Sequence, residues 1–295
     1  MIRSTTSMTA RGILADISLA NQRLSKTQEK LSSGKELNRP SDNPSAVGRA
    51  IQLRREMEAT QQYETNATQA QGWSDVTDSA LSSVSDALQR ARELTVQAAN
   101  DTSGPESRQA IAEELKQLID TVKTAGNASY GGRFVFSGSK TDTRPYTMGA
   151  DDTFAGNSDA VLREIGPGVA LQVNVPGSSF LGTGTSGLIG ALRTVLDHVQ
   201  NGTSTDISGD LNALDGQLDQ LNAVRATVGA TSNRIDVANG RLQEYEGTTL
   251  NLLNETESTD IAKTMIDFTT QQAALTAGLK AGASIVQNSL LDFLR

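Results

Sequence analysis

Cysteine is absent from this 295-residue chain, and it has only 6 prolines, 1 histidine and 4% aromatic residues. Without cysteine, thiol catalysis, disulfides and cysteine metal sites are all excluded. A single histidine leaves no histidine pair to hold a metal ion. The low proline and aromatic content favours long helices over a compact aromatic core. We therefore expect a mainly α protein, and predict neither an enzymatic activity nor a cofactor for it.

Long apolar runs are also missing. No stretch approaches 18 consecutive apolar residues, so no membrane span is predicted. The first eight residues lack the apolar segment of a cleavable signal peptide, so export would need another route. The net charge of −8 and pI of about 4.8 argue against nucleic acid or an anionic membrane as the main partner.

The two ends of the chain instead carry narrow apolar stripes whose steps alternate between three and four residues. This spacing averages about 3.5 residues, the period of a coiled-coil seam. Such a helix is marginal alone in water and needs a partner, so the two stripes indicate an assembly subunit. The predicted seam pairs the two ends in antiparallel sense and consists of Ile13, Ile17, Leu24 and Leu31 with Leu275, Leu279, Val286, Leu290 and Phe293.

Start and stop signals divide the helical part of the chain. A first helix is expected from about Met8 to Ser33, with Gly34 as its left-handed cap. Asn43 and Pro44 are typical of a helix start. Further helices are expected at about 44–100, 105–126, 188–201, 207–255 and 261–295.

Helical periodicity vanishes between Tyr130 and Gly187, where Gly, Asp, Pro and Thr become frequent. Phe134–Phe136 is predicted as a short strand. Alternating apolar residues predict a hairpin from 161–165 and 169–175. We expect a long antiparallel helical bundle or coiled-coil rod with a small inserted β domain. Its predicted domains are 1–40 with 258–295, 41–130 with 187–257, and 131–186.

A few isolated motifs could indicate other functions. Gly182–Gly187 matches G-x-G-x-x-G, but no strand directly precedes it and no second βα unit follows. A return linker from the insert is therefore favoured over a dinucleotide site. His198 is expected at a helix end, and Asp151, Asp152 and Asp159 in turns rather than around calcium. An insert that recognises a sugar or host surface and a long-helix signalling protein are further alternatives.

Several motifs in the correct order resemble the bacterial flagellin family. The N-terminal match includes Leu31, Ser32, Ser33, Gly34, Asn38, Arg39, Ser41, Asp42 and Pro44. Arg92–Leu94 with Gln97–Asn100 resembles the end of the family's long helix, and Gln287–Leu294 resembles its closing segment. The resemblance covers both helical arms, roughly 1–140 and 187–295.

The resemblance implies a structural subunit of the extracellular flagellum, exported unfolded from the cytoplasm through the flagellar type III apparatus. Within the family, Phe134–Thr143 resembles members that connect the hook to the filament by coiled-coil packing, and the filament subunit itself is the alternative. The implied partners are other copies of the chain in a helical ring, neighbouring hook-associated protein and flagellin. A cytoplasmic export chaperone is implied at the C-terminal helix, whose terminal coiled coil folds only on assembly.

Overall fold

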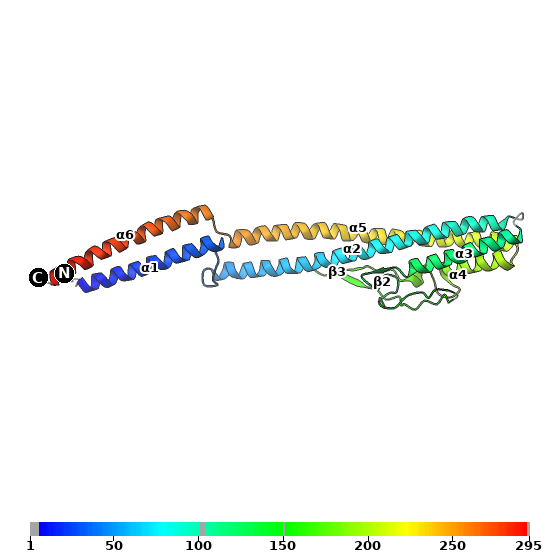
Figure 1. The fold of residues 1–295 in the computed structure, drawn as a ribbon, viewed down its shortest axis with the longest axis horizontal. Coiled ribbons are helices and arrows are strands. Elements are labelled where there is room, and N and C mark those ends of the chain that lie inside the picture. Colours follow the sequence, from blue (N-terminus) through cyan, green and yellow to red (C-terminus); the bar gives the residue numbers. More distant parts are fainter. Residues whose placement is uncertain (1–5, 101–103, 150, 294–295) are drawn as a thin grey trace. The chain divides into compact units, whose positions relative to one another are not determined.

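The computed structural model describes residues 6–100, 104–149 and 151–293 and is mainly helical (Figure 1). Within these ranges, the side chains of residues 6, 7, 9, 10 and 284–293 are not described. The elements are α1 (Thr6–Ser33), α2 (Pro44–Ala99), α3 (Pro105–Gly126), β1 (Ser129–Tyr130), β2 (Arg133–Phe134), β3 (Leu162–Gly166), β4 (Val169–Gln172), the short 3₁₀ helix η1 (Gly177–Ser179), α4 (Gly187–Asn201), α5 (Ser204–Glu257) and α6 (Ile261–Phe293). Long helices with a small β insertion between α3 and α4 confirm the predicted fold class.

The helix ends follow local chemistry. Gly34 has a φ of 68°, and its N–H donates to the Lys30 carbonyl over 2.9 Å, which caps α1. The Asn43 side-chain oxygen accepts from the Ala46 N–H at 3.2 Å and caps the start of α2. At the start of α6, an Asp260 carboxylate oxygen accepts from the Lys263 N–H at 3.0 Å. The caps at Gly34 and Asn43 are the ones that the sequence predicts.

Backbone contacts divide the chain into two compact units, Met1–Ala59 with Glu246–Arg295, and Thr60–Tyr245. Helices α2 and α5 contribute to both units. The predicted domain 1–40 with 258–295 falls within the first unit, and the three-domain division stays a prediction.

The second unit has a continuous apolar core. Alanines on one face of α2 allow neighbouring helices to approach closely, and large aliphatic side chains fill the remaining space. Fully buried examples are Leu81, Leu88, Leu115, Ile119, Leu188 and Leu192. Polar contacts join the outer faces of α2 and α5, including a 2.6 Å ion pair between Arg92 Nε and Asp215 Oδ1.

The insertion contains two antiparallel hairpins, β1–β2 and β3–β4. The β3–β4 hairpin is close to the predicted one and has an irregularity between Glu164 and Gly166. The predicted strand Phe134–Phe136 is wrong beyond Phe134, because Val135 and Phe136 lie in a turn. Both are fully buried, and the Phe136 ring packs edge-on against Phe180 with centroids 5.4 Å apart. They are apolar because they anchor the insertion, not because they extend a sheet.

A fully buried lysine fixes the insertion to α3. Lys123 Nζ lies 2.6 Å from an Asp152 carboxylate oxygen and donates to the backbone carbonyls of Gly149 and Asp151 at 2.7 and 2.8 Å. Arg193 of α4 binds the other Asp152 oxygen over 2.9 Å. Burial raises the pKa of Asp152, but hydrogen bonds from Arg193 and Lys123 outweigh it, so its pKa is lowered.

Candidate assembly surfaces

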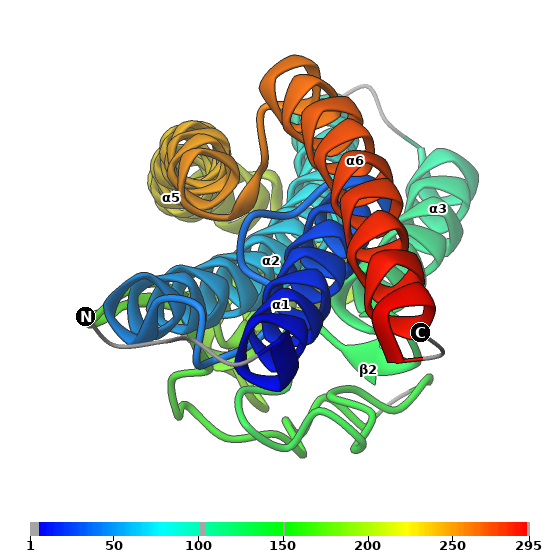
Figure 2. The ribbon, with the colours of Figure 1, turned by 90° about the vertical axis from the view of Figure 1, so that its left-hand side faces the viewer.

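In the first unit, α1 and α6 lie side by side (Figures 1 and 2). Two glycines of α6 lie against α1. A Cβ atom built at Gly282 would lie 3.2 Å from Ile13 Cγ2, and one at Gly278 would lie 3.9 Å from Ile17 Cγ1. The missing side chains of α6 therefore make room for the isoleucines of α1.

A polar pair lies further along the same contact. The buried Thr27 hydroxyl is 2.8 Å from the Gln271 side-chain oxygen, to which it donates. Thr264, which is also buried, donates from its hydroxyl to the Asp260 carbonyl over 2.7 Å. The antiparallel pair thus mixes small, polar and apolar residues.

The predicted seam is only partly brought together. Ile13, Ile17, Leu24, Leu31 and Leu275 are half-buried. Leu279 was expected to face α1, yet it is 51% exposed and lies between the contacting glycines Gly278 and Gly282 in sequence. The contact of α6 with α1 therefore runs through Gly278 and Gly282, and the predicted seam residue Leu279 lies outside it, because glycine allows closer packing than leucine. Val286, Leu290 and Phe293 lie outside the described side chains.

Large apolar side chains remain exposed on both helices. On α1 these include Leu14 at 67% and Leu19 at 46%; on α6 they include Met265 at 52% and Ile266 at 65%. A hollow of about 280 Å³ between the helices is lined by Ile13, Ile17, Ala20, Ala274, Leu275 and Gly278, together with Asp16 and Ala281. Exposed apolar side chains next to an apolar hollow are characteristic of a surface that awaits a partner.

The segment between α1 and α2 is joined to the segment between α5 and α6. The Thr259 N–H donates to the Gly34 carbonyl at 3.1 Å, and the Glu36 N–H donates to the Glu257 carbonyl at 2.7 Å. The largely buried Glu257 carboxylate binds Arg54 at 2.7 Å and Lys35 at 3.3 Å. These contacts hold the two connectors together next to the α1–α6 pair.

The motif residues stabilise the connector after α1. The Ser33 hydroxyl accepts from the Lys35 N–H, and the Asn38 amide donates to the Lys35 carbonyl. Asp42 accepts from the Arg39 N–H at 3.0 Å and pairs with Lys26 at 2.8 Å. Hydrogen bonding with Lys26 lowers the pKa of Asp42. Leu31 is half-buried, Ser32 and Ser41 are exposed, and Pro44 begins α2.

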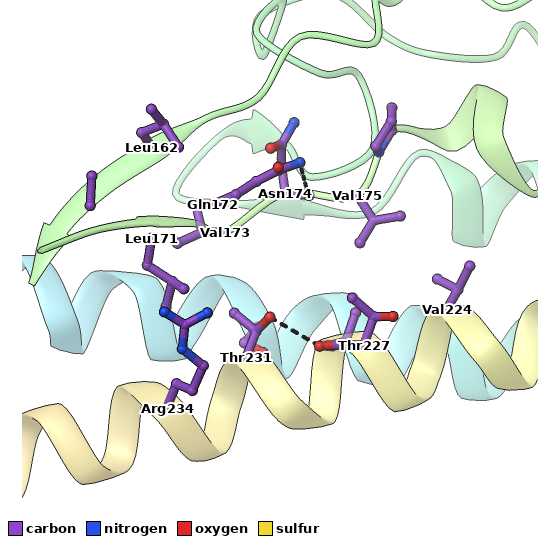
Figure 3. Close-up of a pocket in the computed structure, with 14 residues that line it drawn as sticks. Leu162, Leu171, Gln172, Val173, Asn174, Val175, Val224, Thr227, Thr231 and Arg234 are labelled. Carbon is purple, nitrogen blue, oxygen red and sulfur yellow. Dashed lines mark hydrogen bonds between the residues drawn. The ribbon is translucent and has the colours of Figure 1, made fainter.

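In the second unit, a groove of about 530 Å³ separates β4 from α5 (Figure 3). Leu171 and Val173 line one side, and Val224 and Thr227 line the other. Among the described lining residues, Arg234 alone is charged. The groove is a crevice left where a two-stranded ribbon meets a helix.

The glycine-rich segment is not arranged as a phosphate loop. A Cβ atom at Gly182 would lie 1.9 Å from the Ser186 carbonyl oxygen, and Gly182, Gly184 and Gly187 all have positive φ. The turn is folded tightly upon itself and follows a 3₁₀ helix instead of a strand. Its glycines therefore serve the turn.

The remaining candidates for chemistry have structural partners. His198 Nδ1 lies 2.9 Å from Asp210 Oδ2 near the end of α4. Asp151 accepts from the Thr153 N–H, and Asp159 accepts from the Ser139 hydroxyl. Across the described ranges, no group of three metal-ligating side chains gathers, and no helix has the length and apolar character to cross a membrane.

Two family models match the helical arms. Residues 5–141 match the bacterial flagellin N-terminal helical region, and residues 211–294 match the bacterial flagellin C-terminal helical region. Flagellin FlaB2 of Treponema pallidum (strain Nichols) is 29% identical over 93% of each chain. Flagellar hook-associated protein 3 of Escherichia coli (strain K12) is 24% identical over 86% of this chain and 87% of that protein.

Solved structures share the fold. A putative flagellar hook-associated protein from Vibrio parahaemolyticus is 23% identical and has a TM-score of 0.67 over 74% of this chain and 100% of that chain. Bacillus cereus FlgL is 22% identical and has a TM-score of 0.59 over 69% of this chain and 99% of that chain.

Helices paired from the two ends of the chain, with large apolar side chains left exposed, are typical of a structural subunit that assembles with others. The two matched regions cover most of the chain and identify its family. The chain belongs to the bacterial flagellin family and is a non-enzymatic structural protein of the extracellular flagellum.

Proposed function

We propose that this chain is the junction subunit that connects the flagellar hook to the filament. The observation that carries the proposal is the segment Phe134–Thr143, whose sequence resembles the junction members of the family. In the fold this segment anchors the insertion: Phe136 is fully buried, and Gly138 turns the chain with a φ of 70°. The name of the Escherichia coli relative, flagellar hook-associated protein 3, supports the same assignment.

Assembly through the terminal helices is the proposed mechanism. Leu14, Leu19, Met265 and Leu279 would be covered by neighbouring subunits, since each large apolar side chain contributes roughly 1.5–3 kcal/mol when it is fully buried. Other copies of the chain, a neighbouring hook-associated protein and flagellin are the proposed partners. Before export, a cytoplasmic chaperone would cover the exposed face of α6.

The filament subunit is the second candidate. The Treponema pallidum flagellins match 93% of this chain, a greater share than the Escherichia coli hook-associated protein does. Both candidates require the same terminal helices, so packing alone favours neither.

Deletion of the coding sequence in the source bacterium separates the two candidates. For a junction subunit, we expect intact hooks without filaments and flagellin shed into the medium, detected by electron microscopy and by immunoblotting of the supernatant. Complementation with the wild-type chain should restore filaments. Loss of filaments without shed flagellin would instead identify the chain as the filament subunit.

A further inference from the structure

A pocket of about 300 Å³ in the second unit has an unusual combination of side chains. Trp73 of α2, Tyr130 of β1 and Val173 supply apolar surface, while Arg133 of β2 and Arg163 of β3 supply positive charge. Among the described residues, no acidic side chain lines it. The pocket gathers residues from three separate parts of the sequence.

Neither arginine has a carboxylate partner in the described part of the chain. Some arginines elsewhere pair with carboxylates, such as Arg92 with Asp215 and Arg193 with Asp152, whereas others, such as the exposed Arg241, do not. The backbones of Arg133 and Arg163 belong to hairpin ladders, but their side chains make no ion pair or hydrogen bond with any described residue. What distinguishes Arg133 and Arg163 is that both line one pocket and that no described carboxylate lies among its lining residues, in a chain of net charge −8.

The walls of the pocket are fixed by the fold. Gly131 and Gly132 form the two-residue turn between Tyr130 and Arg133, with φ values of 56° and 79° that favour glycine. The Tyr130 ring lies against Gly72, where an added Cβ would come within 2.6 Å of its hydroxyl oxygen. The pocket is therefore preformed, which lowers the entropic cost of filling it.

The side-chain chemistry selects an anion that also has an apolar part. The planar guanidinium fork suits the two oxygens of a carboxylate. The aromatic and aliphatic wall suits a short methylene stem, which inorganic phosphate lacks. Trp73 adds a second observation, because it is only 5% exposed and its indole nitrogen is buried without an acceptor within the described residues.

We propose that this pocket binds an aliphatic carboxylate, presented either by an acidic side chain of a neighbouring flagellar subunit or by a free short-chain acid. The proposal goes beyond the junction assignment and does not depend on it. Arg133 and Arg163 hold the carboxylate oxygens, and the Trp73 and Tyr130 rings contact the stem.

The protein contains its own probe, because Trp73 is its single tryptophan. We would titrate the purified full-length chain with glutarate at constant ionic strength and follow tryptophan fluorescence. We expect a saturable change that inorganic phosphate does not reproduce. Arg133→Gln and Arg163→Gln should each weaken glutarate binding by about tenfold or more, since each removes charge-assisted hydrogen bonds.

Arg241→Gln is the matched control, because Arg241 is an exposed arginine of α5 that does not line the pocket. It should bind glutarate as the wild type does. Circular dichroism checks folding, and Arg163→Lys, which keeps the charge but loses the fork, should bind with intermediate affinity.

Filament attachment by the Arg133→Gln/Arg163→Gln double variant in the deletion strain distinguishes the two sources of carboxylate. Impaired attachment indicates a neighbouring subunit, and normal attachment with lost glutarate binding indicates a free acid. Glutarate binding is measured on the isolated chain, so the carboxylate pocket can be disproved while the junction assignment stands. The junction assignment can equally be disproved while glutarate binding is observed. No saturable response, an equal response to phosphate, or full binding by the arginine variants would overturn the carboxylate pocket.

Discussion

Ile13 of α1 packs directly over Gly282 of α6, where an added Cβ would lie 3.2 Å from the isoleucine Cγ2 atom. This contact joins opposite ends of the chain, and it is possible because Gly282 has no side chain. It also explains why the exposed leucine of this part of α6, Leu279, lies outside the contact with α1.

Alanine substitutions at the two glycines of α6 should have different effects. Alanine favours a helix over glycine by about 0.5–1 kcal/mol, and at Gly278 the new Cβ would make an ordinary 3.9 Å contact. Gly278→Ala should therefore slow amide hydrogen exchange in α6. Gly282→Ala should show a smaller gain or a loss, because its Cβ crowds Ile13. Equal protection in the two variants would contradict the close approach.

The pair formed by Thr27 and Gln271 should show coupling in a double-mutant cycle. Replacing either residue alone by Val or Leu leaves the other polar group partly buried and should cost about 1–3 kcal/mol of local stability. The double variant Thr27→Val/Gln271→Leu should recover much of this loss, as measured by hydrogen exchange in α1 and α6. Strictly additive effects would show that the two side chains are not paired.

The ion pair of Asp152 with Lys123 should make the second unit sensitive to acid. Because the folded pKa of Asp152 lies below its ordinary value of about 3.9, its stabilisation is present above that pH and is lost as the pH falls through the folded value. Asp152→Asn should remove this part of the pH dependence and lower stability at neutral pH by about 3 kcal/mol, since it leaves Lys123 buried without a carboxylate.

Urea unfolding followed by Trp73 fluorescence measures the stability of the second unit and its dependence on pH, for the wild type and for Asp152→Asn. The double variant Lys123→Met/Asp152→Asn serves as the control and should regain part of the lost stability, because the fully buried Lys123 charge is removed together with its partner. A pH profile for Asp152→Asn that parallels the wild type would rule out this role for the carboxylate.

Leu279 should matter for assembly more than for the isolated chain. Because its side chain is 51% exposed, Leu279→Asp should change the stability of the purified chain by no more than about 0.5 kcal/mol. It should nevertheless reduce filament attachment in the deletion strain, because a carboxylate would have to be buried at the neighbouring subunit. Gln272→Asp, at an exposed polar position on the same helix, should attach filaments more nearly like the wild type. Normal attachment with Leu279→Asp would remove Leu279 from the proposed interface.

Local chemistry made the helices predictable from the sequence. Gly34 and Asn43 cap their helices through contacts within a few residues, so the local sequence pattern is enough to predict them. The register of α6 against α1 could not be read from hydrophobicity, because Gly278 and Gly282 contact α1 through the absence of side chains. Their four-residue spacing is the one signal that could have indicated the contact.

Polar contacts between residues far apart in the sequence could not be predicted from sequence patterns. Lys123 reads as an ordinary basic residue near a helix end, and only the folded insertion surrounds it with carbonyl groups and Asp152. The pocket at Trp73 likewise joins α2 to two separate hairpins. Such sites depend on tertiary placement, which no local periodicity encodes.

Immunogold labelling of intact flagella with an antibody against this chain tests the central claim most directly. Wild-type flagella should carry gold at a single position, the boundary between hook and filament, and the deletion strain should carry none. Gold distributed along the filament would contradict the junction assignment and identify the chain as a filament subunit.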